Sequence, residues 1–102
     1  MTAKSNNGSQ LATPVSTAAY RDEQLSRGCQ SGSYRRLGRT DLHVSLVGFG
    51  GYRIHPSVDE HSDALQYALD SGCNLIDTST NYGDGASERL IGRILVGNKG
   101  RC

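Results

Sequence analysis

Apolar and polar positions change period several times along the chain, and these changes predict the order of its elements. In "YRRLGRTDLHV", two short alternating runs at residues 34–37 and 42–44 flank a turn at 38–41, which predicts a β-hairpin. The next run, "SLVGFGG", is apolar until glycines interrupt it, which is typical of a buried strand that ends in a tight loop. We therefore expect ordered structure to begin at Tyr34.

The stretch after this strand, "SVDEHSDALQYALDSG", follows a helical period. Ser57 and Glu60 have the spacing of a capping box, and Gly72 suits the position just after a helix C-terminus. The apolar positions that fall on one helical face are Val58, Leu65, Ala68 and Leu69. The pattern predicts a helix that begins at Ser57 and ends before Gly72.

A second buried strand and a second helix follow. The strand is "CNLID", and the helix is "SERLIGRIL", whose apolar stripe consists of Leu90, Ile91, Ile94 and Leu95. Alternation of strand and helix implies an α/β fold with a parallel sheet and right-handed crossovers. Because parallel sheets are covered on both faces, two such strands make an incomplete architecture.

Residues 1–33 are rich in Ser, Thr, Ala, Gly, Asn and Gln, and large apolar side chains are sparse there. Such a segment buries too little apolar surface to offset its ordering entropy, so we expect a disordered tail before a domain at 34–102. A transit peptide is the alternative, which Arg21 and Arg27 favour. The acidic residues in this segment argue against it, because transit peptides are poor in acids.

Composition narrows the classes of function. The 102 residues suffice for one small domain, and 11 basic against 10 acidic residues leave a formal charge of +1, which argues against a nucleic-acid partner. The three cysteines, Cys29, Cys73 and Cys102, show no C-x-x-C spacing, so we expect free thiols in the cytoplasm rather than a disulfide framework or a metal site. No apolar run approaches the roughly 18 residues of a membrane span, so we expect no membrane partner.

The polar stretch "DTSTNYGDG" at 77–85 comes directly after the second strand. In parallel α/β folds, the loops after the C-terminal strand ends carry the chemistry, and both Asp77 and Tyr82 lie in such a loop. A tyrosine can protonate a developing alkoxide when a cation lies close by, and Asp77 could be the counter-ion of that cation. The structural alternative is that Asp77 forms a turn and that Tyr82 covers the end of the core.

Two other motifs fit poorly. In "GFGGYR", Gly48 and Gly50 suit a Rossmann fingerprint, but Arg53 occupies the sixth position, where glycine is required. A calcium loop counted from Asp77 would need glycine at its sixth position, and Tyr82 stands there. Its remaining oxygen ligands would be Ser79, Asn81 and Glu88. A calcium-binding module is therefore the least favoured alternative.

Taken together, these segments resemble the N-terminal part of the aldo-keto reductases. The resemblance covers residues 34–95, including the hairpin and the glycine-rich turn. Its most specific parts are D-x-x-x-x-Y-G, from Asp77 to Gly83, and S-E-x-x-x-G, from Ser87 to Gly92. The resemblance implies a TIM (β/α)8 barrel, of which this chain would supply the hairpin and the first two βα units, an incomplete part.

The resemblance also implies a function. Members of the family reduce aldehydes and ketones with NADPH through an Asp, Tyr, Lys and His set, so Tyr82 would be the general acid and Asp77 the partner of the lysine. In the family, the turn after the first strand approaches the cofactor. The resemblance therefore implies that Gly51 and Tyr52, in addition to Asp77, bind the cofactor. The family's lysine and histidine follow later strands, and Lys99 is no substitute because no strand precedes it.

We therefore expect an NADPH-dependent oxidoreductase that acts on a small-molecule carbonyl substrate, with the 102-residue chain an incomplete and inactive fragment. The alternative is a non-enzymatic remnant or interaction fragment of the same fold. Its exposed sheet edge would then allow self-association.

Overall fold

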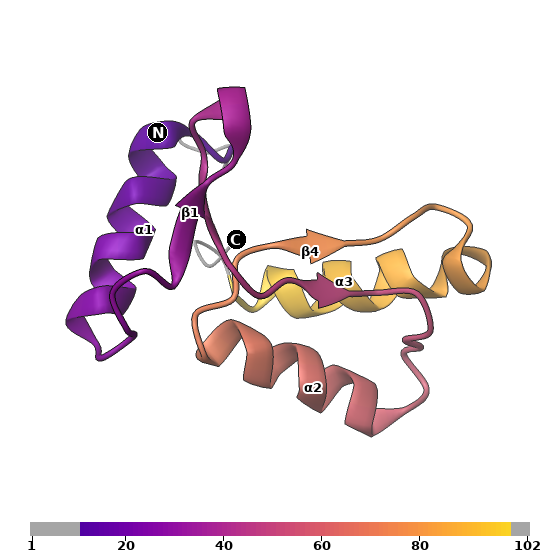
Figure 1. The fold of residues 1–102 in the computed structure, drawn as a ribbon. Helices are drawn as coiled ribbons and strands as arrows, with labels where there is room; N and C mark the ends of the chain where they lie inside the picture. Colours follow the sequence, from indigo (N-terminus) through magenta and orange to yellow (C-terminus); the bar gives the residue numbers. More distant parts are fainter. Residues whose placement is uncertain (1–10, 99–102) are drawn as a thin grey trace. The chain divides into compact units, whose positions relative to one another are not determined.

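The structure, a computed structural model, describes residues 11–98. The chain forms two compact units, divided between Leu46 and Val47. The first contains a helix and a hairpin, and the second alternates strands and helices (Figure 1). The candidate site residues all belong to the second unit.

The hairpin of the first unit is the one that the alternating pattern predicts. Strand β1 (Tyr34–Arg36) pairs antiparallel with β2 (His43–Ser45). A 3-10 turn, η1 (Gly38–Thr40), connects them, and Asp41 after it adopts a left-handed conformation with φ of 58°. The predicted hairpin is therefore confirmed.

Helix α1 (Pro14–Ser26) occupies part of the segment that we expected to be a disordered tail. Thr13 and Ser16 cap its first turn reciprocally: Thr13 Oγ1 accepts from the Ser16 N–H at 3.0 Å, and Ser16 Oγ accepts from the Thr13 N–H at 2.9 Å. Proline at the first helical position adds a preset φ. The expectation of disorder was wrong for α1, because the overall composition of a segment does not reveal which residues cap a helix. Residues 1–10, the rest of the expected tail before α1, lie outside the described residues.

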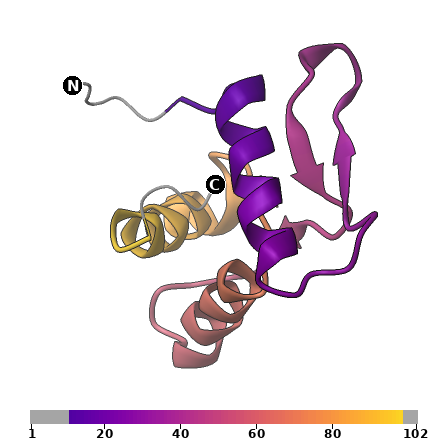
Figure 2. The same ribbon diagram turned by 90° about the vertical axis from the view of Figure 1, so that its left-hand side faces the viewer.

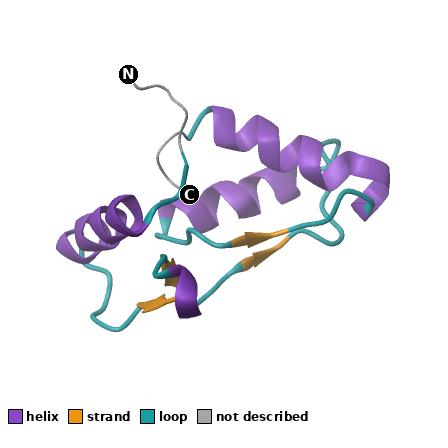
Figure 3. Cartoon of the chain, turned by 90° about the horizontal axis from the view of Figure 1, so that it is seen from above, coloured by secondary structure: helices purple, strands orange, loops and turns teal. Residues whose placement is uncertain are grey.

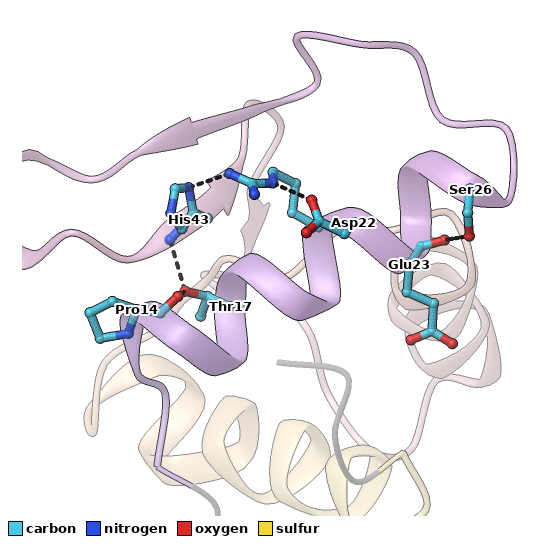
Figure 4. Close-up of polar contacts among 7 residues, drawn as sticks. Pro14, Thr17, Asp22, Glu23, Ser26 and His43 are labelled. Carbon is cyan, nitrogen blue, oxygen red and sulfur yellow. Dashed lines mark hydrogen bonds and ion pairs between the residues drawn. The ribbon is translucent and has the colours of Figure 1, made fainter.

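Helix α1 lies beside the hairpin (Figure 2), and polar contacts join the two (Figure 4). The backbone N–H of His43 donates to Thr17 Oγ1 at 3.0 Å, and a guanidinium nitrogen of Arg21 lies 3.1 Å from His43 Nδ1. The rings of Tyr20 and Tyr34 meet edge to face, with centroids 6.2 Å apart. Contacts with the hairpin therefore order a helix whose sequence is mostly polar.

The second unit alternates strands and helices as predicted. Its elements are β3 (Phe49–Gly50), α2 (Asp59–Asp70), β4 (Ile76–Asp77), the 3-10 turn η2 (Tyr82–Gly85) and α3 (Ala86–Val96). β3 and β4 pair in parallel, and both helices lie on the same side of the pair (Figures 1 and 3). The α/β class is confirmed, and within residues 11–98 the strands do not close a barrel.

The core of this unit forms where the two helices meet. Leu65 and Leu69 of α2 are buried with Leu90 and Ile91 of α3. The partly buried apolar residues packed against this cluster are Phe49, Ile54, Ile76, Ile94 and Leu95. Each helix contributes side chains spaced to lie on one face, so the periodicity of the sequence predicted most of this core.

The two ends of α2 differ in how well the sequence predicted them. The helix begins at Asp59 and no side chain caps its first turn, so the capping box of Ser57 and Glu60 was a wrong prediction. Ser57 instead turns toward His55, with Oγ 2.8 Å from Nδ1. At the other end, Gly72 has a φ of 97°, the left-handed conformation expected of the residue that follows a helix.

Neither Cys29 nor Cys73 forms a disulfide within the described part of the chain, and Cys102 lies outside it. The Cys73 thiol donates to the carbonyl of Val47 at 3.3 Å.

Among residues 11–98, no helix combines the length and the apolar character that crossing a membrane requires.

Candidate functional site

The four candidate residues gather where β3 and β4 end. Parallel pairing sets Gly50 opposite Asp77, and the next residue, Gly51, donates its N–H to the Asp77 carbonyl at 2.9 Å. Tyr52 and Tyr82 follow in the loops that leave these strand ends. Because both strands run in the same direction, their loops emerge at one edge, as in other parallel α/β folds.

Gly51 is buried against the start of α3. A Cβ at this position would lie 2.7 Å from Ser87 Oγ, 3.2 Å from the Asp77 carbonyl oxygen and 3.3 Å from Ile91 Cδ1. Ser87 is 0 % exposed, and its Oγ lies 2.6 Å from Thr78 Oγ1. This hydroxyl pair ties the loop after β4 to α3, and only a glycine lets the end of β3 approach it.

Tyr52 and Tyr82 are in contact. Their ring centroids lie 5.0 Å apart and their planes meet at 79°, which is an edge-to-face arrangement. The guanidinium carbon of Arg53 lies 5.2 Å from the centroid of the Tyr52 ring. Tyr52 is 62 % exposed and Tyr82 is half-buried, so the pair sits at the surface of the site.

Three consecutive left-handed residues carry the chain from Tyr82 into α3. Gly83, Asp84 and Gly85 have φ values of 59°, 54° and 92°. Glycine adopts this conformation without steric cost, and Asp is one of the few other residues that tolerate it. The turn therefore requires residues that tolerate a left-handed conformation at all three positions.

The side chain of Asp77 makes no hydrogen bond or ion pair with any residue among 11–98. The hydroxyl of Tyr82 likewise makes no hydrogen bond there. The exposed Asp77 carboxylate is thus accessible to a cation, although Lys99 lies outside the described residues. Within those residues, no group of three or more His, Cys, Asp or Glu side chains is placed to hold a metal ion.

The chain is similar to known proteins of one family. The sequence model of the aldo/keto reductase family matches residues 46–101, so the chain belongs to the aldo/keto reductase family. A curated relative, aldo-keto reductase AMT2 from Alternaria alternata, is 39 % identical over 71 residues. That alignment covers 62 % of this chain and 19 % of the relative, so the chain spans about a fifth of the length of the relative that it matches. No solved structure gives a significant match.

The structure joins the backbones of Gly51 and Asp77 by a hydrogen bond, and it sets Tyr82 against Tyr52. Two features were missed. The Thr78 to Ser87 contact was not anticipated, because the sequence marks Ser87 only as the first residue of the S-E-x-x-x-G motif. No sequence pattern could have predicted the contact between the rings of Tyr52 and Tyr82, since the two tyrosines come from different loops.

Proposed function

We propose that this chain supplies the general acid of a carbonyl-reducing active site, Tyr82, and the carboxylate of Asp77 that supports it. Membership of the aldo/keto reductase family supports an oxidoreductase of aldehydes or ketones in general. The more specific assignment depends on one observation, the convergence of Asp77 and Tyr82 at the C-terminal edge of the parallel strand pair, with Tyr52 in ring contact.

In this proposal Tyr82 donates its hydroxyl proton to the carbonyl oxygen as the alcohol forms. A phenol is a weak acid near neutral pH, so the reaction needs a cation that stabilises the phenolate left behind. Asp77 would hold that cation, a lysine, through its exposed and unpaired carboxylate. The described residues supply neither this lysine nor a histidine beside Tyr82, so we expect negligible turnover from the 102-residue chain.

The proposed cofactor is NADPH, with its nicotinamide end held by Gly51, Tyr52 and Asp77. One observation supports this proposal: Gly50 is exposed, and nothing lies within 4 Å of the place where its Cβ would be, so the backbone leaves open space there. The exposed ring of Tyr52 offers a flat surface beside it. When bound, nicotinamide supplies the hydride that adds to the carbonyl carbon.

We further propose that these elements form part of a TIM barrel. The unit has two parallel strands, each followed by a helix, with both helices on one side of the strands. A TIM barrel repeats this βα unit eight times and places its chemistry at the C-terminal ends of the strands, where Asp77 and Tyr82 lie.

A segment exchange tests the catalytic assignment. Residues 46–98 would replace the aligned segment of the Alternaria alternata relative, and NADPH oxidation would be followed with a panel of aldehydes. We expect Tyr82→Phe to lower kcat by at least about 100-fold, since loss of a general acid removes that much. Asp77→Asn should also lower kcat, because it removes the carboxylate that would hold the lysine. Tyr67→Phe, on an exposed tyrosine of α2, is the matched control and should be neutral.

Two results would contradict the proposal. Turnover in the exchanged enzyme that survives Tyr82→Phe would remove Tyr82 from its proposed position as general acid. Appreciable turnover by the 102-residue chain alone, abolished by Tyr82→Phe, would contradict the expected inactivity.

A second candidate is an interaction fragment that associates through its open sheet edge. Within residues 11–98, β3 and β4 pair only with each other, and Val47 beside β3 is 75 % exposed. Unpaired edges readily accept another strand. Sedimentation velocity should then show association that rises with concentration and weakens in Val47→Lys, while Val96→Lys, on exposed α3 surface, leaves it unchanged. A monomer at every concentration would exclude this candidate.

A further inference from the structure

The ring of Tyr82 is held by another ring rather than by its hydroxyl. No hydrogen bond to this hydroxyl occurs among the described residues. The ring itself meets that of Tyr52 at 79°, with centroids 5.0 Å apart. Edge-to-face pairs of this geometry are favourable beyond the area that they bury. The orientation of the Tyr82 phenol therefore depends on where Tyr52 lies.

Tyr52 is well placed to set that orientation, although it is 62 % exposed. Its neighbour Gly51 is buried against Ser87 and donates its N–H to the Asp77 carbonyl at 2.9 Å, so the backbone at this point is tied to β4. The guanidinium carbon of Arg53 lies 5.2 Å from the centroid of the Tyr52 ring, within the range of a cation–π contact. An exposed aromatic side chain is thus held through both its backbone and its ring.

We propose that Tyr52 is a positioning residue for Tyr82, an inference that rests on the proposed function of Tyr82 as general acid. A general acid must lie within about 2.6–3.2 Å of its acceptor, and small displacements cost rate steeply. Tyr52 acts through ring packing, so its own hydroxyl is dispensable. Phenylalanine should replace it, whereas leucine, which lacks the ring, should not.

The contact can be tested on the 102-residue chain without any catalysis. Nuclear magnetic resonance with ring-labelled tyrosine resolves five tyrosines, which single Tyr→Phe variants assign. We expect a nuclear Overhauser effect between the rings of Tyr52 and Tyr82 in the unsubstituted chain. Because this effect is measured without a substitution at either tyrosine, it does not depend on whether a variant folds. Tyr52→Leu should move the Tyr82 ring signals toward those of free tyrosine, and Tyr52→Phe should leave them in place. Tyr67→Leu is the control.

The effect on catalysis is measured in the exchanged enzyme. Tyr52→Leu should lower kcat at saturating NADPH about three- to tenfold, the fold-change that corresponds to one lost aromatic pair. It should change the KM of the carbonyl substrate by less than about twofold, whereas the KM of NADPH reports separately on the proposed cofactor contact of Tyr52. Tyr52→Phe should restore kcat. A substrate-contact role for Tyr52 would instead raise KM.

The outcomes separate this inference from the proposed function. If Tyr82→Phe abolishes turnover but Tyr52→Leu leaves kcat unchanged, only the positioning role is wrong. Turnover that survives Tyr82→Phe would overturn both, because no acid would remain to be positioned. Absence of the ring-to-ring Overhauser effect, or Tyr82 signals that do not move in Tyr52→Leu, would overturn the inference whatever the kinetics show.

Discussion

Replacing Gly51 with alanine should destabilise the second unit, because the added methyl group has no space. A Cβ at this position would lie 2.7 Å from Ser87 Oγ and 3.2 Å from the carbonyl oxygen of Asp77. The first distance is shorter than side chains tolerate. The second atom belongs to the backbone of β4, so it moves only if the strand pair moves.

The magnitude has two parts. Ser87 Oγ could rotate away, but it is fully buried and would lose its contact with Thr78 Oγ1, and a buried hydroxyl without a partner costs about 1–3 kcal/mol. Overpacking against the Asp77 carbonyl and Ile91 costs about 1–3 kcal/mol in addition. Partial relaxation reduces the sum, so we expect a loss of about 2–4 kcal/mol.

Urea titration followed by far-ultraviolet circular dichroism measures this loss. A single small core supplies only roughly 3–5 kcal/mol, so the titration is run in trimethylamine N-oxide, which strengthens apolar burial. With an m-value of about 1–2 kcal/mol/M, the midpoint should fall by about 2 M. Gly50→Ala is the matched control, because nothing lies within 4 Å of its Cβ, and should change stability by less than about 0.5 kcal/mol.

A double substitution identifies the cause. Ser87→Ala removes the atom that the new methyl group meets, so Gly51→Ala with Ser87→Ala should be less destabilised than the sum of the two single variants by about 1 kcal/mol. The reasoning fails if Gly50→Ala and Gly51→Ala lower the midpoint equally. It also fails if the two single effects simply add.

Three further predictions concern other parts of the structure, each measured by the same urea titration. Leu90→Ala, at a fully buried core position, should cost about 2–5 kcal/mol, and a loss no larger than that of Val96→Ala on the exposed face would contradict the core assignment. Asp84→Gly should stabilise by about 0.5–1 kcal/mol, because glycine adopts the left-handed φ of 54° without strain; unchanged or lower stability would argue against that conformation. Thr17→Val should cost about 1–3 kcal/mol, because it removes the oxygen that accepts from the His43 N–H, and it should speed hydrogen exchange of that amide; an unaltered exchange rate would contradict the contact.

Prediction from the sequence succeeded where a signal is repeated along one element. The spacing of Leu65 and Leu69, and that of Leu90 and Ile91, marked the buried faces of α2 and α3. It failed at the start of α2. Ser57 could cap a helix, but its hydroxyl contacts His55 instead, since a short polar side chain has several local partners of similar energy.

Helix α1 shows the limit of composition. The segment is polar, and its reciprocal cap uses Ser16 where a capping box usually has Glu or Gln. Its order comes from contacts with β2, of which the bond from His43 to Thr17 is one. No pattern within residues 14–26 encodes that partner, because it comes from a different element.

By itself, the sequence determined the order of strands and helices from the hairpin onward and the positions of Asp77 and Tyr82 after the end of a strand, because period and spacing are local properties. Only the tertiary structure decided that Tyr52 meets Tyr82 and that Gly51 packs against the hydroxyl of Ser87. These contacts join the loop after β3 to the turn before α3 and to α3 itself, and parallel pairing of β3 with β4 is what brings them together. Packing between distant segments depends on the shape of the folded backbone, which residue types alone do not specify.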